Sequence, residues 1–294
     1  MAYFIQLTST GVMTGGLYGL VAVGLVLIYK TTKVFNFAQG ELLMIGSFCT
    51  WWFLTGLGFP LWASFLLMLV CATALGLFLE RFLMRPMIGQ PMLAIVMLTI
   101  CLSPALRAVA ILIWSGNRFA YPSIIPLESL MVGGLHISPQ LLLCFIVALV
   151  AIGIFAVFFQ RSRTGITMRA VAEGHKAAQA CGIKVNRVFA QAWVISAILA
   201  GIAGIGLGSL GGVCSSLADI GLVALAVALV GGLESVYGVV VAGLIVGIVE
   251  SVTTGYLDVA VGGGFGAITP YIVMLLLLLW RPYGLFGLRR IERI

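Results

Sequence analysis

The sequence predicts an all-α membrane protein, a polytopic bundle of about eight or nine transmembrane helices with at least one broken or re-entrant helix. Of its 294 residues, 62% are hydrophobic and only 9% are charged, too little polar surface to cover a water-soluble globule. The charges are clustered between long apolar stretches, and the alternating strand pattern of an outer-membrane barrel is missing. We therefore expect one transmembrane domain over residues 1–294.

The first three apolar segments set the expected orientation. Residues 12–29 stop at Lys30 and Lys33, which the positive-inside rule places in the cytoplasm, with the N-terminus outside. Residues 35–57 then cross outward. Residues 61–79 return and end in a second charged cluster on the cytoplasmic side. The net charge of +7 would suggest nucleic-acid binding in a soluble protein, but here it marks cytoplasmic loops, and we expect no nucleic-acid partner.

The next two segments flank the longest outer connection. Residues 92–114 contain Ser103, Pro104 and Arg107, and because proline removes a backbone hydrogen bond, we expect a kink or two half-helices there. Residues 115–139 form the outer connection. The fifth segment, residues 140–159, leads back to the cytoplasm.

The remaining segments complete the bundle. Residues 189–210 are rich in glycine and alanine, which permit close helix approach, so this segment should pack centrally. Residues 220–230 are short enough for a half-span or re-entrant segment, and residues 236–252 and 269–280 follow. Four arginines lie in the tail: Arg281, Arg289, Arg290 and Arg293. They place the C-terminus inside.

Motifs for enzymatic chemistry are missing from the sequence. No segment reads G-x-x-x-x-G-K-[ST] or G-x-S-x-G, so we expect neither nucleotide hydrolysis nor a serine hydrolase site. The two histidines, His136 and His175, lack Cys or carboxylate groups at ligand spacing, which argues against a metal site. The six cysteines are scattered singly and should be free thiols. We expect a chain that is not an enzyme and binds no cofactor itself.

The stretch FNFAQGE, residues 35–41, is the first strong functional signal. It opens an apolar run with Asn36, Gln39, Gly40 and Glu41. A carboxylate in the bilayer is costly, so Glu41 should face protein, water or the headgroup zone. One interpretation is an interfacial helix start with Asn36 as the N-cap. The other is that these polar residues line a translocation path or hold a broken helix beside it.

Two further acids interrupt the apolar sequence. Glu234 lies between two predicted segments, where a loop position is the better interpretation. Glu250 lies near a predicted outer end beside Ser251 and Thr254, which indicates a solvated rim. Neither is strong evidence for proton coupling.

The charged loop of residues 161–188 is the second strong signal. It holds six basic residues between Arg161 and Arg187 against one acid, Glu173. Alanines three or four residues apart predict a short helix with a smooth face, ended by Gly182. Such a surface helix is suited to docking into a partner, although an amphipathic segment on anionic headgroups is the alternative.

Several stretches, in order along nearly the whole chain, resemble one transport family. They are residues 15–20, 35–41, 169–183, 247–251 and 281–287, together with Gly231, Gly232, Gly238 and Gly243. They resemble the Liv-type permeases, the membrane subunits of branched-chain amino acid ABC importers, and the LivH type most of all. The resemblance implies a multi-pass permease of a bacterial cytoplasmic membrane.

The same resemblance implies partners and site residues. A second permease subunit, often a LivM-type paralogue, would pair with this chain, cytoplasmic ATPase subunits would supply ATP and Mg, and a periplasmic binding protein would deliver the small-molecule substrate. The early motif would place Asn36, Gln39, Gly40 and Glu41 near the translocation path. The coupling loop on the ATPase would comprise Gly165, Arg169, Ala170, Glu173, Ala178, Gly182 and Ile183.

Departures from the family pattern leave the substrate open. Gln39 stands where histidine is common in that family, and Val223 stands where lysine is common. Branched-chain amino acids remain the first expectation, and urea, short amides or another small acid are alternatives. An ion-coupled secondary transporter using Glu41 is the rival mechanism, and a scaffold or receptor without transport is a third hypothesis.

Overall fold

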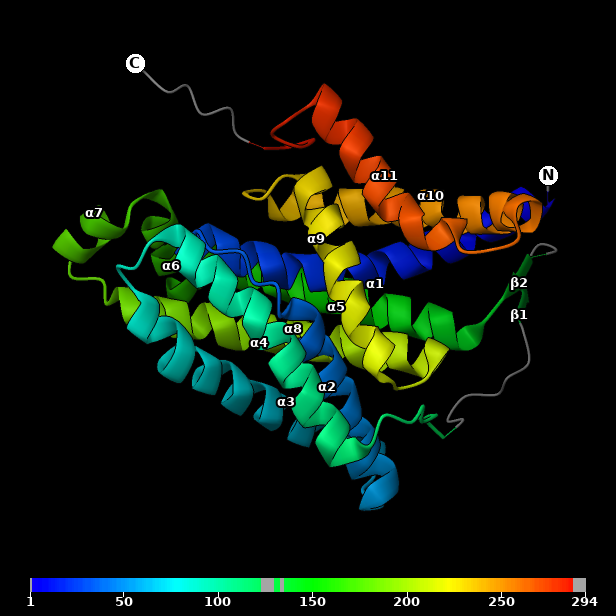
Figure 1. The fold of residues 1–294 in the computed structure, drawn as a ribbon, viewed down its shortest axis with the longest axis horizontal. Helices are drawn as coiled ribbons and strands as arrows, with labels where there is room; N and C mark the ends of the chain where they lie inside the picture. The colour runs from blue at the N-terminus through cyan, green and yellow to red at the C-terminus, as the bar shows by residue number, and fades with distance from the viewer. Residues whose placement is uncertain (1, 123–129, 133–134, 288–294) are drawn as a thin grey trace.

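A computed structural model describes residues 2–122, 130–132 and 135–287 as a bundle of helices, shown in Figure 1. The elements in chain order are α1 (Ala2–Thr32), α2 (Gln39–Trp51), η1 (Trp52–Gly56), α3 (Leu61–Phe78), η2 (Leu79–Met84), η3 (Arg85–Met87), α4 (Met92–Trp114), β1 (Leu130–Val132), β2 (Leu135–Ile137), α5 (Pro139–Arg161), α6 (Arg163–Glu173), α7 (His175–Ala180), α8 (Val185–Gly211), η4 (Ser215–Asp219), α9 (Ile220–Gly231), α10 (Val236–Val261) and α11 (Phe265–Trp280). The predicted all-α class is confirmed, with one addition: β1 and β2 pair antiparallel in a two-stranded hairpin.

Each predicted apolar segment coincides with a helix. In the described part of the chain, six helices are long and apolar enough to cross a membrane: α1, α3, α4, α5, α8 and α10. Three others are shorter. α2 has 13 residues and continues into the π-helical η1, η4 continues into α9, and α11 has 16 residues. Helices satisfy their own backbone polar groups, which is why apolar sequence of this length becomes helical in a bilayer.

Two helices form the centre of the bundle. α1 and α8 are 83% and 67% buried over their most apolar stretches. The prediction that the small residues of α8 give it a central place is confirmed. A Cβ on Gly201 would overlap Met68 of α3, and a Cβ on Gly204 would overlap the Leu43 carbonyl of α2. The glycines therefore let α2 and α3 approach α8 closely.

α1 and α10 meet through glycines on both helices. A Cβ on Gly15 would overlap the Gly243 carbonyl, and a Cβ on Gly247 would overlap the Gly11 carbonyl. Gly11 and Gly15 are four residues apart on α1, and Gly243 and Gly247 are four residues apart on α10. The two glycines of each helix therefore lie on one face of it. In a bilayer there is no hydrophobic driving force between helices, so close van der Waals packing of this kind stabilises their association.

The expectation of two half-helices in residues 92–114 was wrong. α4 is one continuous helix from Met92 to Trp114, with Pro104 inside it. Proline removes one backbone hydrogen bond, and a membrane helix tolerates that loss when the freed carbonyl is satisfied locally. The non-helical break lies instead between α1, which ends at Thr32, and α2, which begins at Gln39.

The two ends of the long axis carry different structures. Figure 1 shows α6 and α7 at one end and the β1–β2 hairpin with the start of α1 at the other. Near α6 and α7, Lys33 Nζ lies 2.9 Å from Glu234 Oε1, and Lys30 Nζ donates to the Glu234 carbonyl. Glu234 thus occupies the turn between α9 and α10, as predicted. Arg289, Arg290, Arg293 and part of the outer connection lie outside the described residues.

The prediction of a solvated rim at Glu250 was wrong. Glu250 is half-buried in α10, and Tyr18 of α1 donates to its Oε1 over 3.3 Å. Its Oε2 is buried without a hydrogen-bond partner in the described part of the chain. The neighbouring Ser251 and Thr254 donate to backbone carbonyls, so their hydroxyls do not form a polar rim.

Candidate functional site

The chain turns back into the bundle directly after α1. α1 ends at Thr32 and α2 begins at Gln39. Between them, Thr99 Oγ1 of α4 donates to the Phe35 carbonyl over 3.1 Å. Gln39 lies against Gly24 of α1, eight residues before the end of that helix, or about 12 Å along its axis. α2 therefore begins inside the bundle, as Figure 1 shows, which agrees with the expected broken helix.

Asn36 and Gln39 form a buried polar network at this point. Asn36 Oδ1 accepts the Ala38 N–H, and its Nδ2 donates to Gln39 Oε1, both over 3.1 Å. Ser196 of α8 donates to the same Gln39 oxygen over 2.9 Å. Among the described residues, Gln39 Nε2 is buried without a partner. The interpretation of Asn36 as the N-cap was wrong. Ala38 is the N-cap of α2, and Asn36 lies two residues before it, where its side chain accepts the Ala38 N–H.

Gly40 brings the start of α2 into backbone contact with the start of α9. A Cβ on Gly40 would overlap the Ala218 carbonyl of η4. A Cβ on Gly221 would in turn lie 2.5 Å from the Gly40 nitrogen. Two short helices thus begin at one place, because neither glycine carries a side chain.

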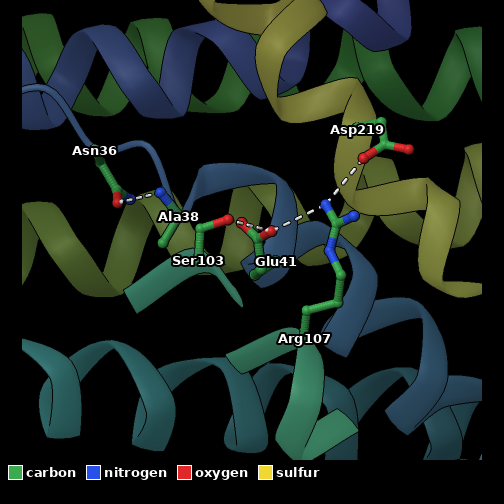
Figure 2. Close-up of polar contacts among 6 residues, drawn as sticks. All are labelled: Asn36, Ala38, Glu41, Ser103, Arg107 and Asp219. Atoms are coloured by element: carbon green, nitrogen blue, oxygen red, sulfur yellow. Dashed lines mark hydrogen bonds and ion pairs between the residues drawn. The ribbon is translucent and has the colours of Figure 1, made fainter. Parts of the chain in front are cut away.

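Glu41 lies next to this crossing and joins a chain of polar contacts from three elements, drawn in Figure 2. Ser103 Oγ of α4 donates to Glu41 Oε1 over 2.7 Å. Arg107 Nη2, one turn further along α4, donates to the same oxygen over 3.2 Å and to Asp219 Oδ1 over 2.9 Å. Arg107 therefore bridges the start of α2 to the end of η4.

The three charges differ in exposure. The side chain of Glu41 is 2% exposed, that of Arg107 is 34% exposed, and that of Asp219 is 60% exposed. A buried carboxylate is tolerated when it is both paired and hydrogen-bonded, and Ser103 and Arg107 supply both interactions. The expectation that Glu41 faces protein is confirmed. Its role in translocation stays a prediction.

Sequence reasoning missed Arg107, Asp219 and Ser196 as members of this site. One signal could have found Arg107: it lies four residues after Ser103 in an apolar helix, so both share a face, and a charge there needs a partner. No signal connects Asp219 or Ser196 to residues 36–41, because they lie more than 150 residues away along the chain.

The charged loop forms two helices instead of the single one predicted. α6 and α7 are separated by Gly174. α7 ends at Ala180, and two residues later Gly182 has a φ of 80°, in the left-handed region that favours glycine. The predicted terminating role of Gly182 is thus confirmed. The Ile183 N–H donates back to the Ala178 carbonyl and closes the turn.

Both helices are attached to the bundle through backbone carbonyls. Arg169 of α6 donates to the carbonyls of Phe159 and Gln160 at the end of α5. The His175 ring nitrogen of α7 lies 2.9 Å from the Thr31 carbonyl at the end of α1. A displacement of α6 and α7 would therefore act directly on α5 and α1.

The residues predicted for coupling do not form one exposed face. Gly165 and Ala178 are buried inward, and a Cβ on Gly165 would overlap the Phe159 carbonyl. Glu173 and Gly182 are exposed. The other three are partly buried: Arg169, Ala170 and Ile183. Two kinds of residue are therefore present, some that attach the helices and some that a partner can reach.

The profile of the branched-chain amino acid transport system permease component family matches residues 7–280, which include the α2–η4 crossing and both loop helices. The chain belongs to this family. The resemblance read from the sequence motifs is thereby confirmed, and the chain is a membrane transport permease.

Curated members of this permease family are similar to the chain over nearly their whole length. The high-affinity branched-chain amino acid transport system permease protein LivH of Escherichia coli strain K12 is 30% identical over 99% of this chain and 98% of its own. BraD of Pseudomonas aeruginosa, with the same description, is also 30% identical over the same shares. A probable LivH permease of Methanocaldococcus jannaschii is 29% identical over 94% of this chain and 90% of its own.

Proposed function

We propose that the chain is the membrane-spanning permease subunit of an ATP-driven ABC importer for branched-chain amino acids. The near full-length similarity to permeases named for branched-chain amino acid transport carries this proposal. The chain supplies the pathway and catalyses no reaction. It binds no cofactor, and ATP and Mg act at separate ATPase subunits. Urea, short amides or another small acid are the alternative substrates, which the identity of about 30% leaves open.

α6 and α7 are the proposed docking element for the ATPase. Glu173 and Gly182 are exposed for contact with a partner, whereas Arg169 and His175 attach the two helices to α5 and α1. Closure of the ATPase subunits on ATP would move α6 and α7 together with the helix ends they hold. The permease would then alternate between inward-open and outward-open states.

The start of α2 is the proposed part of the translocation path. Asn36, Gln39, Gly40 and Glu41 lie inside the bundle, where a broken helix provides polar groups that a continuous helix would not. Glu41 is held by Ser103 and Arg107. That pairing favours ATP-driven transport over ion coupling at Glu41, because an ion-coupling carboxylate must release its partner in each cycle.

The proposed topology puts the N-terminus outside and the C-terminus inside a bacterial cytoplasmic membrane. Basic residues gather at the end with α6 and α7, which is the cytoplasmic end by the positive-inside rule. Eight or nine crossings result if α2 with η1, η4 with α9, and α11 join the six long helices. A second permease subunit of LivM type and a periplasmic binding protein complete the assembly.

Affinity purification of the tagged chain from its native membrane, in mild detergent, tests the proposal. Mass spectrometry should identify a P-loop ATPase and a second permease in the purified complex. A Glu173→Arg variant should lose the ATPase but keep the second permease, whereas exchange of an exposed arginine on α6, in Arg163→Ala, should lose neither. Recovery of the chain alone, with uptake in proteoliposomes that needs no ATP, would establish a secondary carrier instead.

A further inference from the structure

A partly exposed charge, Arg107, and an exposed one, Asp219, lie within the apolar length of the bundle. Arg107 is 15 residues from the start of α4 and seven from its end, or about 22 Å and 10 Å along the helix. α4 is the least buried of the six long helices, with 11% of its most apolar stretch buried. Charged side chains inside a membrane face water, protein or each other, because lipid does not solvate them. The face carrying Arg107 and Asp219 must therefore border an aqueous pathway or a protein partner.

Each of these two charges keeps unused hydrogen-bonding capacity. Arg107 donates to both acids through one nitrogen, Nη2. In the part of the chain that the structure describes, its Nε and Nη1 donate to no other group, and Asp219 Oδ2 accepts from none. Figure 2 shows the guanidinium lying between Glu41 and Asp219 with its other edge turned away from Glu41. A cationic donor and an anionic acceptor thus lie side by side, both accessible.

Glu41 has a different part in this arrangement. Its side chain is 2% exposed and is held by Ser103, so it fixes Arg107 from the buried side. Asp219, at 60%, is the acid that a ligand can reach. Leu222 follows Asp219 by one helical turn and is 47% exposed, which gives the same face an apolar neighbour.

We propose that Arg107 and Asp219 form a binding site for the head group of an α-amino acid, with the substrate carboxylate on Arg107 and the substrate ammonium on Asp219. The adjacent opposite charges match a zwitterion, and neither a lone cation nor a lone anion would use both. The aliphatic side chain of the substrate lies toward Leu222. This inference depends on the proposed function and adds to it the residues that select an amino acid.

Photolabelling of the complete importer in nanodiscs, with a diazirine analogue of leucine, tests the site. Label should be found in peptides containing Arg107 or Asp219. Leucine should compete with it, whereas leucinamide and 4-methylpentanoate, which each lack one charge, should compete at least about tenfold less well. Arg107→Gln and Asp219→Asn should each reduce labelling by about tenfold or more.

Asp219→Asn and one further variant separate binding from folding. Asp219→Asn leaves the Arg107–Glu41 pair in place, so the importer should purify intact. Arg85→Gln is the matched control, because Arg85 is a 40% exposed arginine paired over 3.0 Å with the 2% exposed Glu80, and it should label like the wild type.

Different results overturn different claims. Wild-type labelling that persists in both Arg107→Gln and Asp219→Asn, or leucinamide that competes as well as leucine, overturns the head-group site. An ion triad that only locks α4 to α2 would give this result. If the wild-type importer also takes up leucine with ATP, the proposed function still stands. A wild-type importer without any ATP-dependent leucine uptake contradicts the proposed function itself.

Discussion

Gly40 of α2 and Gly221 of α9 lie in backbone contact, with no space for a side chain on either residue. This contact joins two short helices that both begin within the bundle. It also brings Glu41 within reach of Arg107, which in turn holds Asp219. The polar site is therefore a consequence of two glycines in neighbouring short helices.

A methyl group at this contact should destabilise the fold. In Gly40→Ala, the new Cβ would overlap the Ala218 carbonyl, and overpacking of this kind costs about 1–3 kcal/mol or more. Gly153→Ala in α5 is the matched control, since a Cβ there meets no atom within 4 Å. Thermal unfolding in detergent, followed by size-exclusion chromatography, should show a lower midpoint for Gly40→Ala only. Equal midpoints for the two variants would contradict the close contact.

Loss of the buried acid should cost more stability than loss of a partly exposed ion pair. Glu41→Ala leaves Ser103 and Arg107 without their buried acceptor, which should reduce the free energy of unfolding by about 1–3 kcal/mol. Lys33→Ala breaks a pair whose side chains are 32% and 24% exposed, so about 0–1 kcal/mol is expected. Reversible denaturation in mixed micelles measures both changes. A larger effect in Lys33→Ala would refute this ranking.

Much of the fold follows from the sequence, and the reason is the bilayer. Apolar length predicts each helix because lipid leaves no other way to satisfy the backbone, and the small residues of α8 predict its central position. The site is only half predictable. The polar stretch around Glu41 is visible because charge is rare in such a segment. The partners of Glu41 depend on which helices meet at Gly40, and no local sequence pattern shows which helices those are.

Pro104 and Glu250 show why local patterns also misled. Proline chemistry predicts a kink or a break, and the break did not occur, because α4 stays continuous across Pro104. Glu250 lies among hydroxyl residues that suggest water, yet those hydroxyls bond to backbone carbonyls and Glu250 accepts from Tyr18. In both cases the structure depends on contacts with neighbouring elements, which the local sequence does not contain.

The attachment of α6 to α5 should control the coupling between ATP hydrolysis and transport. Arg169→Ala removes two hydrogen bonds from a charged donor to the carbonyls at the end of α5. Because each such bond contributes roughly 1.5–3 kcal/mol, leucine uptake per ATP hydrolysed should fall at least about tenfold. Arg163→Ala is the control on the same helix, because Arg163 makes no hydrogen bond or ion pair within the described residues. Equal coupling in both variants would show that Arg169 transmits no movement.

An exposed cysteine, kept as the only cysteine of the chain, tests the orientation. Cys181 lies in the exposed turn after α7, and the other five cysteines can be replaced. A membrane-impermeant maleimide should label Cys181 in inside-out vesicles and leave it unlabelled in right-side-out spheroplasts. In the same background, Cys181→Ser with Tyr3→Cys should show the opposite pattern, because Tyr3 is exposed near the other end of α1. Labelling of Cys181 in spheroplasts would reverse the topology.

In the proposed function, this chain carries branched-chain amino acids only as part of an ATP-driven assembly. The most direct measurement is uptake of radiolabelled leucine into proteoliposomes that contain the co-purified complex, with binding protein outside and ATP inside. We expect accumulation that requires both ATP and the binding protein, and that stops when the ATPase is removed. Leucine accumulation by this chain alone, driven by an ion gradient without ATP, would contradict the proposed function.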